Sequence, residues 1–113
     1  MLTIDALKKY GADVDQGLRR CMNNETFYLR LVGMALNDKN FDSLRTALND
    51  GNLERAFDAA HTLKGVLGNL ALTPMYDDVY RLTELLRSRT DIDYSDHLAA
   101  IEAKRAELMK LAE

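Results

Sequence analysis

The stretch Asn52–Leu70, NLERAFDAAHTLKGVLGNL, reads as one long helix. Asn52 is a favourable N-cap residue, and the preceding Asp50-Gly51 is typical of a break before a helix. Apolar residues recur in alternating steps of three and four, which predicts an inward-facing stripe made of Leu53, Ala56, Ala60, Leu63, Leu67 and Leu70. The rest of the chain is expected to pack around this stripe.

A neighbouring face of the same helix carries a histidine and two glycines. At about 100° per residue, His61, Gly65 and Gly68 fall off the apolar stripe, and Lys64 lies at its border, one turn from His61. Each glycine costs about 1 kcal/mol relative to alanine inside a helix, so neither glycine serves the helix itself. Bare backbone beside an exposed histidine suits a histidine that another macromolecule must approach closely. The alternative is a helix with two tolerated glycines and an incidental surface histidine.

This segment resembles a known family. The residues that carry the resemblance are Ala60-His61-Thr62-Leu63-Lys64-Gly65, followed by Gly68-Asn69-Leu70. They are similar to the core motif of the histidine-containing phosphotransfer (HPt) domains of multistep two-component signalling. Residue-level similarity covers about positions 57–70, whereas the order and size of the predicted helices resemble the family over most of the chain.

The sequence departs from the family pattern at two positions. Ala71 stands where many members carry a glycine soon after the Asn-Leu pair. Thr83, with Glu84 beside it, stands where many members carry a Glu or Gln that supports the active site. The resemblance therefore implies a supporting role for Thr83 or Glu84 and leaves open which of the two has it.

The chemistry expected of this face is phosphoryl transfer. A neutral imidazole has a free ring lone pair, so an exposed His61 can attack an aspartyl phosphate without a general base. Lys64 would offset the added negative charge as a point charge. The docking face around His61 is predicted to include Gly65, Gly68, Phe57, Asp58 and Asn69. Phe57 fits the edge of the core equally well.

The resemblance also implies what the partner supplies. A receiver domain of a response regulator or hybrid kinase would bring the aspartate, a bound Mg²⁺ and its own lysine, and would dock over Gly65 and Gly68. The chain itself has no glycine-rich loop after a strand and no acidic pair placed to hold Mg²⁺ beside a nucleotide. It is therefore expected to be a carrier without its own ATP site or cofactor, and not an enzyme.

The sequence also contains features that are typical of other functions. Asp58-x-x-His61 is a spacing found in di-iron bundles, but the second histidine, His97, follows Tyr94 at the same spacing, so no metal is expected. Two alternatives stay open. One is the histidine-bearing domain of a chemotaxis-type kinase, which takes its phosphate from an ATP-binding domain. The other is a docking module whose histidine is incidental.

Composition limits the class of protein. A chain of 113 residues is expected to form a single domain over 1–113. The net charge of −3 and the helical context argue against a nucleic-acid partner. The single cysteine, Cys21, and the lack of a signal peptide or long apolar run favour a cytoplasmic protein without membrane insertion. The polar outer faces of the helices favour a monomer, and a chain that begins at Met1 favours the relay carrier over the chemotaxis-type domain.

The remaining helices are predicted from caps and apolar periodicity at about 3–10, 14–22, 24–36, 41–49, 74–88 and 94–111. Thr73 is the expected cap of the helix that starts at Pro74. The inner face of the third helix is predicted to be Phe27, Leu31 and Met34. Short loops between amphipathic helices favour antiparallel neighbours. The predicted fold is therefore all-α, an up-and-down antiparallel four-helix bundle with one or two short extra N-terminal helices.

Overall fold

Seven helices make up the protein. The structure, a computed structural model, describes all of residues 1–113. The helices are α1 (Ile4–Tyr10), α2 (Val14–Arg20), α3 (Glu25–Leu36), α4 (Asn40–Asn49), α5 (Leu53–Asn69), α6 (Thr73–Arg87) and α7 (Ser95–Leu111). No strand is present, so the predicted all-α class is confirmed. None of the helices has the length and apolarity needed to cross a membrane.

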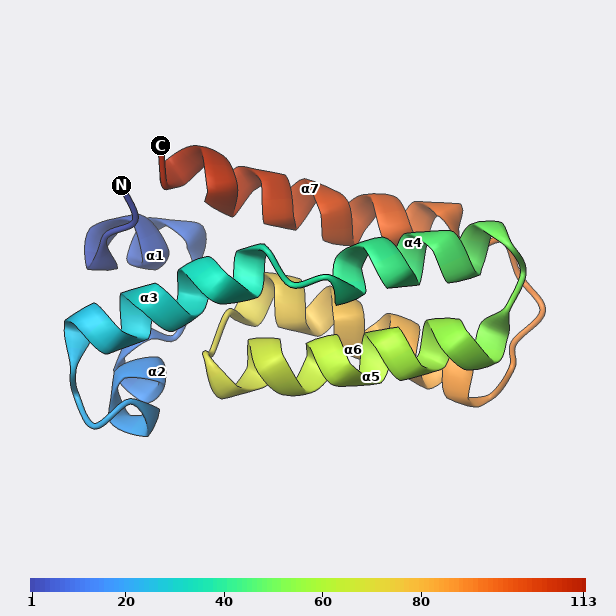
Figure 1. Cartoon of the computed structure of the whole chain (residues 1–113), viewed down its shortest axis with the longest axis horizontal. Helices are drawn as coiled ribbons and strands as arrows, with labels where there is room; N and C mark the ends of the chain where they lie inside the picture. The colour runs from blue at the N-terminus through green and yellow to red at the C-terminus, as the bar shows by residue number, and fades with distance from the viewer.

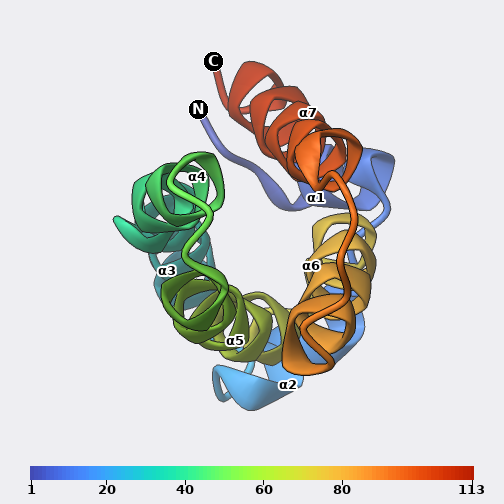
Figure 2. The same ribbon diagram turned by 90° about the vertical axis from the view of Figure 1, so that its right-hand side faces the viewer.

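The helices that follow one another in the second half of the chain are neighbours in space. Helix α5 packs against α4 and α6, and α6 packs against α7. Figure 1 shows α3 and α4 running in one direction, α5 in the opposite direction, α6 back again and α7 parallel to α5. The view along the long axis shows α4, α5, α6 and α7 around one interior (Figure 2). Helix α1 lies against α7, and α2 lies near the end of the molecule where α5 ends.

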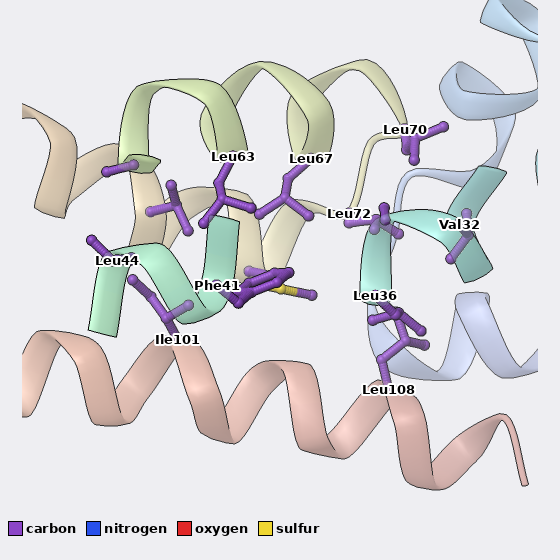
Figure 3. Close-up of a cluster of buried hydrophobic side chains, with 14 of the residues drawn as sticks. Val32, Leu36, Phe41, Leu44, Leu63, Leu67, Leu70, Leu72, Ile101 and Leu108 are labelled. Carbon is purple, nitrogen blue, oxygen red and sulfur yellow. The ribbon is translucent and has the colours of Figure 1, made fainter. Parts of the chain in front are cut away.

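The interior is filled by one apolar stripe from each of these helices. In α5 the predicted stripe is buried, with Leu63 and Leu67 at 0 % exposure. Figure 3 shows these two side chains pointing into the same interior as Leu44 and Ile101. The stripe predicted for α6 is fully buried as well, and consists of Met75, Val79, Leu82 and Leu86. Burying a large aliphatic side chain contributes about 1.5–3 kcal/mol, so these stripes hold α5 and α6 together.

The ends of the helices follow local chemistry. The Asn52 side chain accepts a hydrogen bond from the Arg55 amide at 3.1 Å, which makes Asn52 the predicted cap of α5. Helix α6 begins one residue earlier than predicted, with Leu72 at the cap position. Thr73 therefore lies inside the helix, and its hydroxyl donates to the Ala71 carbonyl at 3.3 Å. The predicted Thr73 cap is wrong because the chain enters the helix before this residue.

The buried face of α3 differs from the prediction. Met34 is 63 % exposed, and the buried residues are Tyr28, Val32, Ala35 and Leu36. Apolar residues surround most of this helix, so periodicity alone does not select a face. Tertiary contact does: the Tyr28 ring packs beside Gly17, and its hydroxyl donates to the Leu70 carbonyl at 2.8 Å.

Helix α5 is closed by an alanine in an uncommon conformation. Ala71 has a φ of 57° and is buried. The left-handed region costs an L-residue about 1–2 kcal/mol, a cost that glycine avoids. This backbone gives a physical reason for a glycine at the position where Ala71 departs from the family pattern.

Candidate functional site

His61 lies in the middle of the exposed face of α5. Its side chain is exposed, and the buried stripe of the helix lies on the other side. Gly65, one turn further on, is also exposed, and a Cβ built there would meet no atom within 4 Å. A partner can therefore reach the helix backbone directly beside the histidine.

Gly68 has different surroundings from Gly65. A Cβ at Gly68 would lie 2.8 Å from Cε1 of Tyr76, which belongs to α6. Real Cβ atoms do not approach another heavy atom so closely, so this glycine makes room for the tyrosine ring. The expectation of bare backbone at Gly68 is corrected: the lack of a side chain there serves packing between α5 and α6.

The His61 ring stacks on Phe57. The two ring centroids are 5.6 Å apart, and the ring planes differ by 14°. Phe57 precedes His61 by four residues, so both side chains lie on one side of the helix. Phe57 is half-buried and packs against the core, so it both borders the core and contacts the histidine.

Lys64 is directed toward α6. Its Nζ atom lies 5.5 Å from the centroid of the Tyr80 ring, within the range of a cation–π interaction. The ammonium group has no carboxylate partner at ion-pair distance. Lys64 is therefore available to an anion that arrives on the neighbouring turn at His61.

The two candidates for a supporting role lie in different environments. Thr83 is fully buried, and its hydroxyl donates to the Val79 carbonyl of its own helix at 2.7 Å. Glu84 is half-buried and forms an ion pair with Arg87, with 3.2 Å between Oε2 and Nε. The Arg87 guanidinium in turn lies 5.0 Å from the centroid of the Phe57 ring. Glu84 thus reaches the histidine through two other side chains.

Contacts between α5 and α6 define an antiparallel register. Tyr76 lies beside Gly68, Tyr80 beside Lys64, and Arg87 beside Phe57. In this register, His61 falls opposite Thr83. The flank of the site toward α6 is therefore made of aromatic rings and cations, which we call the aromatic flank: Phe57, Tyr76, Tyr80, Lys64 and Arg87.

The opposite flank of the exposed face is less filled. Asp58 and Asn69 are both exposed, as the docking prediction requires. Asn69 stands at the edge of a shallow apolar groove between α3 and α5, lined by Leu31, Met34, Ala35, Asp38, Val66, Asn69 and Leu70. We call this the apolar groove.

Several residues of the site could not be found by reading the sequence. Arg20 of α2 donates from its guanidinium to the Gly68 carbonyl, at the C-terminal end of α5. Tyr76, Tyr80 and Arg87 come from α6, and the only signal in the sequence is the spacing of four between the two tyrosines. No group of three or more His, Cys, Asp and Glu side chains gathers as a metal site would require.

One comparison with known proteins gives a match. The model of the Hpt domain family matches residues 34–110, which is more than half of the chain and includes all of α4, α5 and α6. His61, Lys64 and the aromatic flank lie inside the matched range. No curated protein and no solved structure matches the chain.

Proposed function

The chain belongs to the Hpt domain family, and on that premise we propose that it is a phosphohistidine carrier in a multistep two-component phosphorelay. Hpt domains are histidine phosphotransfer domains that work with the receiver domains of two-component systems. In our proposal His61 accepts a phosphoryl group from the aspartate of one receiver and donates it to that of another. The observation that carries the proposal is an exposed mid-helix histidine beside the open backbone of Gly65.

The reaction at His61 is a reversible exchange of one bond for another. The Nε2 atom of the imidazole, which extends farthest from the backbone, attacks the phosphorus of an aspartyl phosphate. A P–N bond forms, the P–O bond to the aspartate breaks, and the carboxylate leaves with the electron pair. Phosphoryl transfer of this kind needs in-line geometry and charge neutralisation more than covalent help from the protein.

Charge neutralisation would be shared between the two proteins. Lys64 stands one turn from His61 without a carboxylate partner, so its ammonium can leave the Tyr80 ring and contact the phosphoryl oxygens. The receiver supplies Mg²⁺ and a lysine of its own. The chain needs no ATP site for this role, and we infer that it is a carrier and not a kinase.

The architecture that serves this role is also part of the proposal. We infer that α4, α5, α6 and α7 act as an up-and-down four-helix bundle, within a single domain over 1–113, that holds α5 rigid while its outer face meets a partner. Neighbouring helices connected by short loops support this inference. We further propose that the protein acts as a cytoplasmic monomer and binds receivers, not nucleic acid.

A phosphotransfer assay tests the proposal. Wild type and His61→Gln are each mixed with Mg²⁺ and a panel of phosphorylated receiver domains from the same organism. We expect acid-labile, alkali-stable label on wild type and none on the variant. His97→Gln is the matched control, because it removes the other histidine from a different helix and should label like wild type.

Two outcomes would favour the alternatives. Label that arrives only from a kinase catalytic domain with ATP would indicate a chemotaxis-type phosphoacceptor domain. No label from either source, with partner binding that is indifferent to His61→Gln, would indicate a docking module.

A further inference from the structure

We propose that Phe57 is a positioning residue for the His61 imidazole, and that Arg87, held by Glu84, positions Phe57. This inference rests on the proposed function, because it concerns the orientation of the ring that would carry the phosphoryl group. It assigns a role to two residues of α6 that do not touch the imidazole themselves. It also gives Glu84, rather than Thr83, the supporting role.

The contact with the Phe57 ring restricts the orientation of the His61 imidazole. An exposed side chain ordinarily changes rotamer on the picosecond to nanosecond timescale. The nearly parallel stack of His61 on Phe57, with centroids 5.6 Å apart and planes within 14°, favours one orientation of the imidazole. In-line attack requires such an orientation, and a misplacement of about 1 Å can cost about 100-fold in rate. The stack therefore does at His61 what a hydrogen bond does for histidines in other sites.

Phe57 is itself held by contacts on two sides. Its ring is half-buried against the core on one side of α5. The Arg87 guanidinium lies 5.0 Å from the ring centroid and comes from the neighbouring helix. The ring is therefore held between the core and a side chain anchored in α6, so its own orientation depends on the packing of α6 against α5.

Arg87 is held by an ion pair within α6. Its Nε atom pairs with Glu84 Oε2 at 3.2 Å, three residues earlier on the same helix. A guanidinium held by a carboxylate has fewer orientations available for its contact with the ring. The order of action is thus from Glu84 to Arg87, to Phe57 and to His61.

Thr83 has no comparable route to the imidazole. It falls opposite His61 in the register between the helices, but its hydroxyl is fully buried and donates to the Val79 carbonyl. Thr83 therefore offers packing at this level of the interface and not a polar contact.

The experiment uses the full chain and four variants. Phe57→Leu keeps an apolar side chain but removes the ring, whereas Phe57→Tyr keeps an aromatic ring at this position. Arg87→Ala removes the guanidinium from Phe57. Arg81→Ala is the matched control, because Arg81 is another exposed arginine of α6, pairs with Asp78 at 2.9 Å, and does not contact Phe57.

The first measurement is NMR of the unphosphorylated protein. A stacked phenyl ring shifts the His61 Hδ2 and Hε1 resonances. We expect Phe57→Leu to move both toward the values of a free histidine, Arg87→Ala to move them part of the way, and Phe57→Tyr and Arg81→Ala to leave them nearly in place. Amide spectra check that each variant is folded, and Arg87→Ala keeps the test valid if Phe57→Leu does not fold.

The second measurement is single-turnover phosphotransfer from a phosphorylated receiver. For Phe57→Leu we expect a roughly tenfold lower rate at saturating receiver, with little change in the receiver concentration at half-maximal rate. Phe57→Tyr should restore the rate, and Arg87→Ala should give a smaller loss. A residue that only fills the edge of the core would not produce this split.

Three results would overturn the inference. Unchanged His61 resonances in Phe57→Leu would show that the two rings do not stack in solution. Shifted resonances with an unchanged transfer rate would show that the stack has no role in the reaction. If Arg87→Ala gives the same results as Arg81→Ala in both measurements, Arg87 does not position Phe57. If wild type accepts label from no receiver, the proposed function fails by itself, whereas the NMR measurement needs no phosphoryl donor and still decides whether the ring is ordered.

Discussion

Helix α5 meets its neighbours in different ways on its two sides. Toward α6, side chain packs on side chain: Tyr76 lies over Gly68, and the Lys64 ammonium lies near the Tyr80 ring. Toward α3, one hydrogen bond runs from the Tyr28 hydroxyl to the carbonyl of Leu70, the residue that caps the C-terminal end of α5, beside the open apolar groove. The histidine therefore has ordered neighbours on the aromatic flank, whereas its other flank, at Asp58 and Thr62, borders an open hollow between α4 and α5. A partner that docks over His61 meets a pre-arranged surface on one side only.

The largest effect is expected from a substitution that removes the hydrogen bond on the α3 side. Tyr28→Phe removes the hydroxyl that donates to the buried Leu70 carbonyl at 2.8 Å. An unsatisfied buried acceptor costs about 1–3 kcal/mol, so the free energy of unfolding should fall by that amount. Denaturant unfolding at pH 7 measures it. A loss below about 0.5 kcal/mol would mean that this side is held by apolar packing and not by the hydrogen bond.

The same substitution should also change how stability depends on pH. Burial, followed by the nearby Cys21 and Asp13, raises the pKa of Tyr28 to about 12, above the usual tyrosine value of about 10. The folded state then keeps a proton that the unfolded state loses, so wild-type stability falls as the pH rises from about 10 to about 12. Tyr28→Phe should lack this part of the decline. Burial also raises the pKa of Tyr10, but Tyr10 is present in both proteins, so the difference between the two curves isolates Tyr28.

The next largest effect is the difference in stability between alanine substitutions at the two glycines of the exposed face. Gly65→Ala places a methyl group in open space, so it should raise the free energy of unfolding by about 1 kcal/mol through helix propensity. Gly68→Ala places the same group 2.8 Å from the Tyr76 ring, and overpacking of about 1–3 kcal/mol should cancel or reverse that gain. Denaturant unfolding of the two variants gives the difference directly. Equal stabilisation would show that Tyr76 moves aside freely and that the aromatic flank is not tightly packed.

A smaller effect is expected at the end of α5. Ala71→Gly relieves the positive φ of 57° and should stabilise the protein by about 0.5–1 kcal/mol, less than the full cost of the left-handed conformation because glycine also loses more chain entropy on folding. Ala103→Gly, at an exposed helical position of α7, is the control and should destabilise by about 1 kcal/mol. Thermal unfolding of both variants checks the opposite signs. Destabilisation by Ala71→Gly would mean that the buried methyl group outweighs the backbone.

The smallest effect concerns the cation on the aromatic flank. A double-mutant cycle of Lys64→Gln and Tyr80→Leu should give a coupling of about 0.5–1 kcal/mol in the free energy of unfolding, the usual size for an exposed cation–π pair. Tyr80→Phe retains the ring and should retain the coupling. A coupling indistinguishable from zero would mean that the Tyr80 ring does not hold the Lys64 ammonium in place.

The sequence predicts the buried face of a helix wherever polar and apolar residues separate cleanly around it. The four residues predicted for the α6 stripe are all fully buried, and the α5 stripe was predicted correctly from Ala56 to Leu70, although the buried Ala59 was missed and Leu53 is only half-buried. The cap at Asn52 was predicted from its side-chain chemistry. The exposed position of His61 follows from the same separation. The face of α3 was predicted wrongly because this helix is apolar on most of its surface, so two stripes fit the pattern equally well.

The sequence by itself thus determined the helices, the inner face of α5 and the exposed histidine with open backbone at Gly65. These features depend on the periodicity of a single helix and on local hydrogen bonds, which do not require contacts with other helices. Only the tertiary structure decided that Gly68 accommodates Tyr76, that Lys64 lies near Tyr80 and that Arg87 reaches Phe57. Such contacts depend on the register of α6 against α5, which is set by how two helices interlock and not by the periodicity of either one.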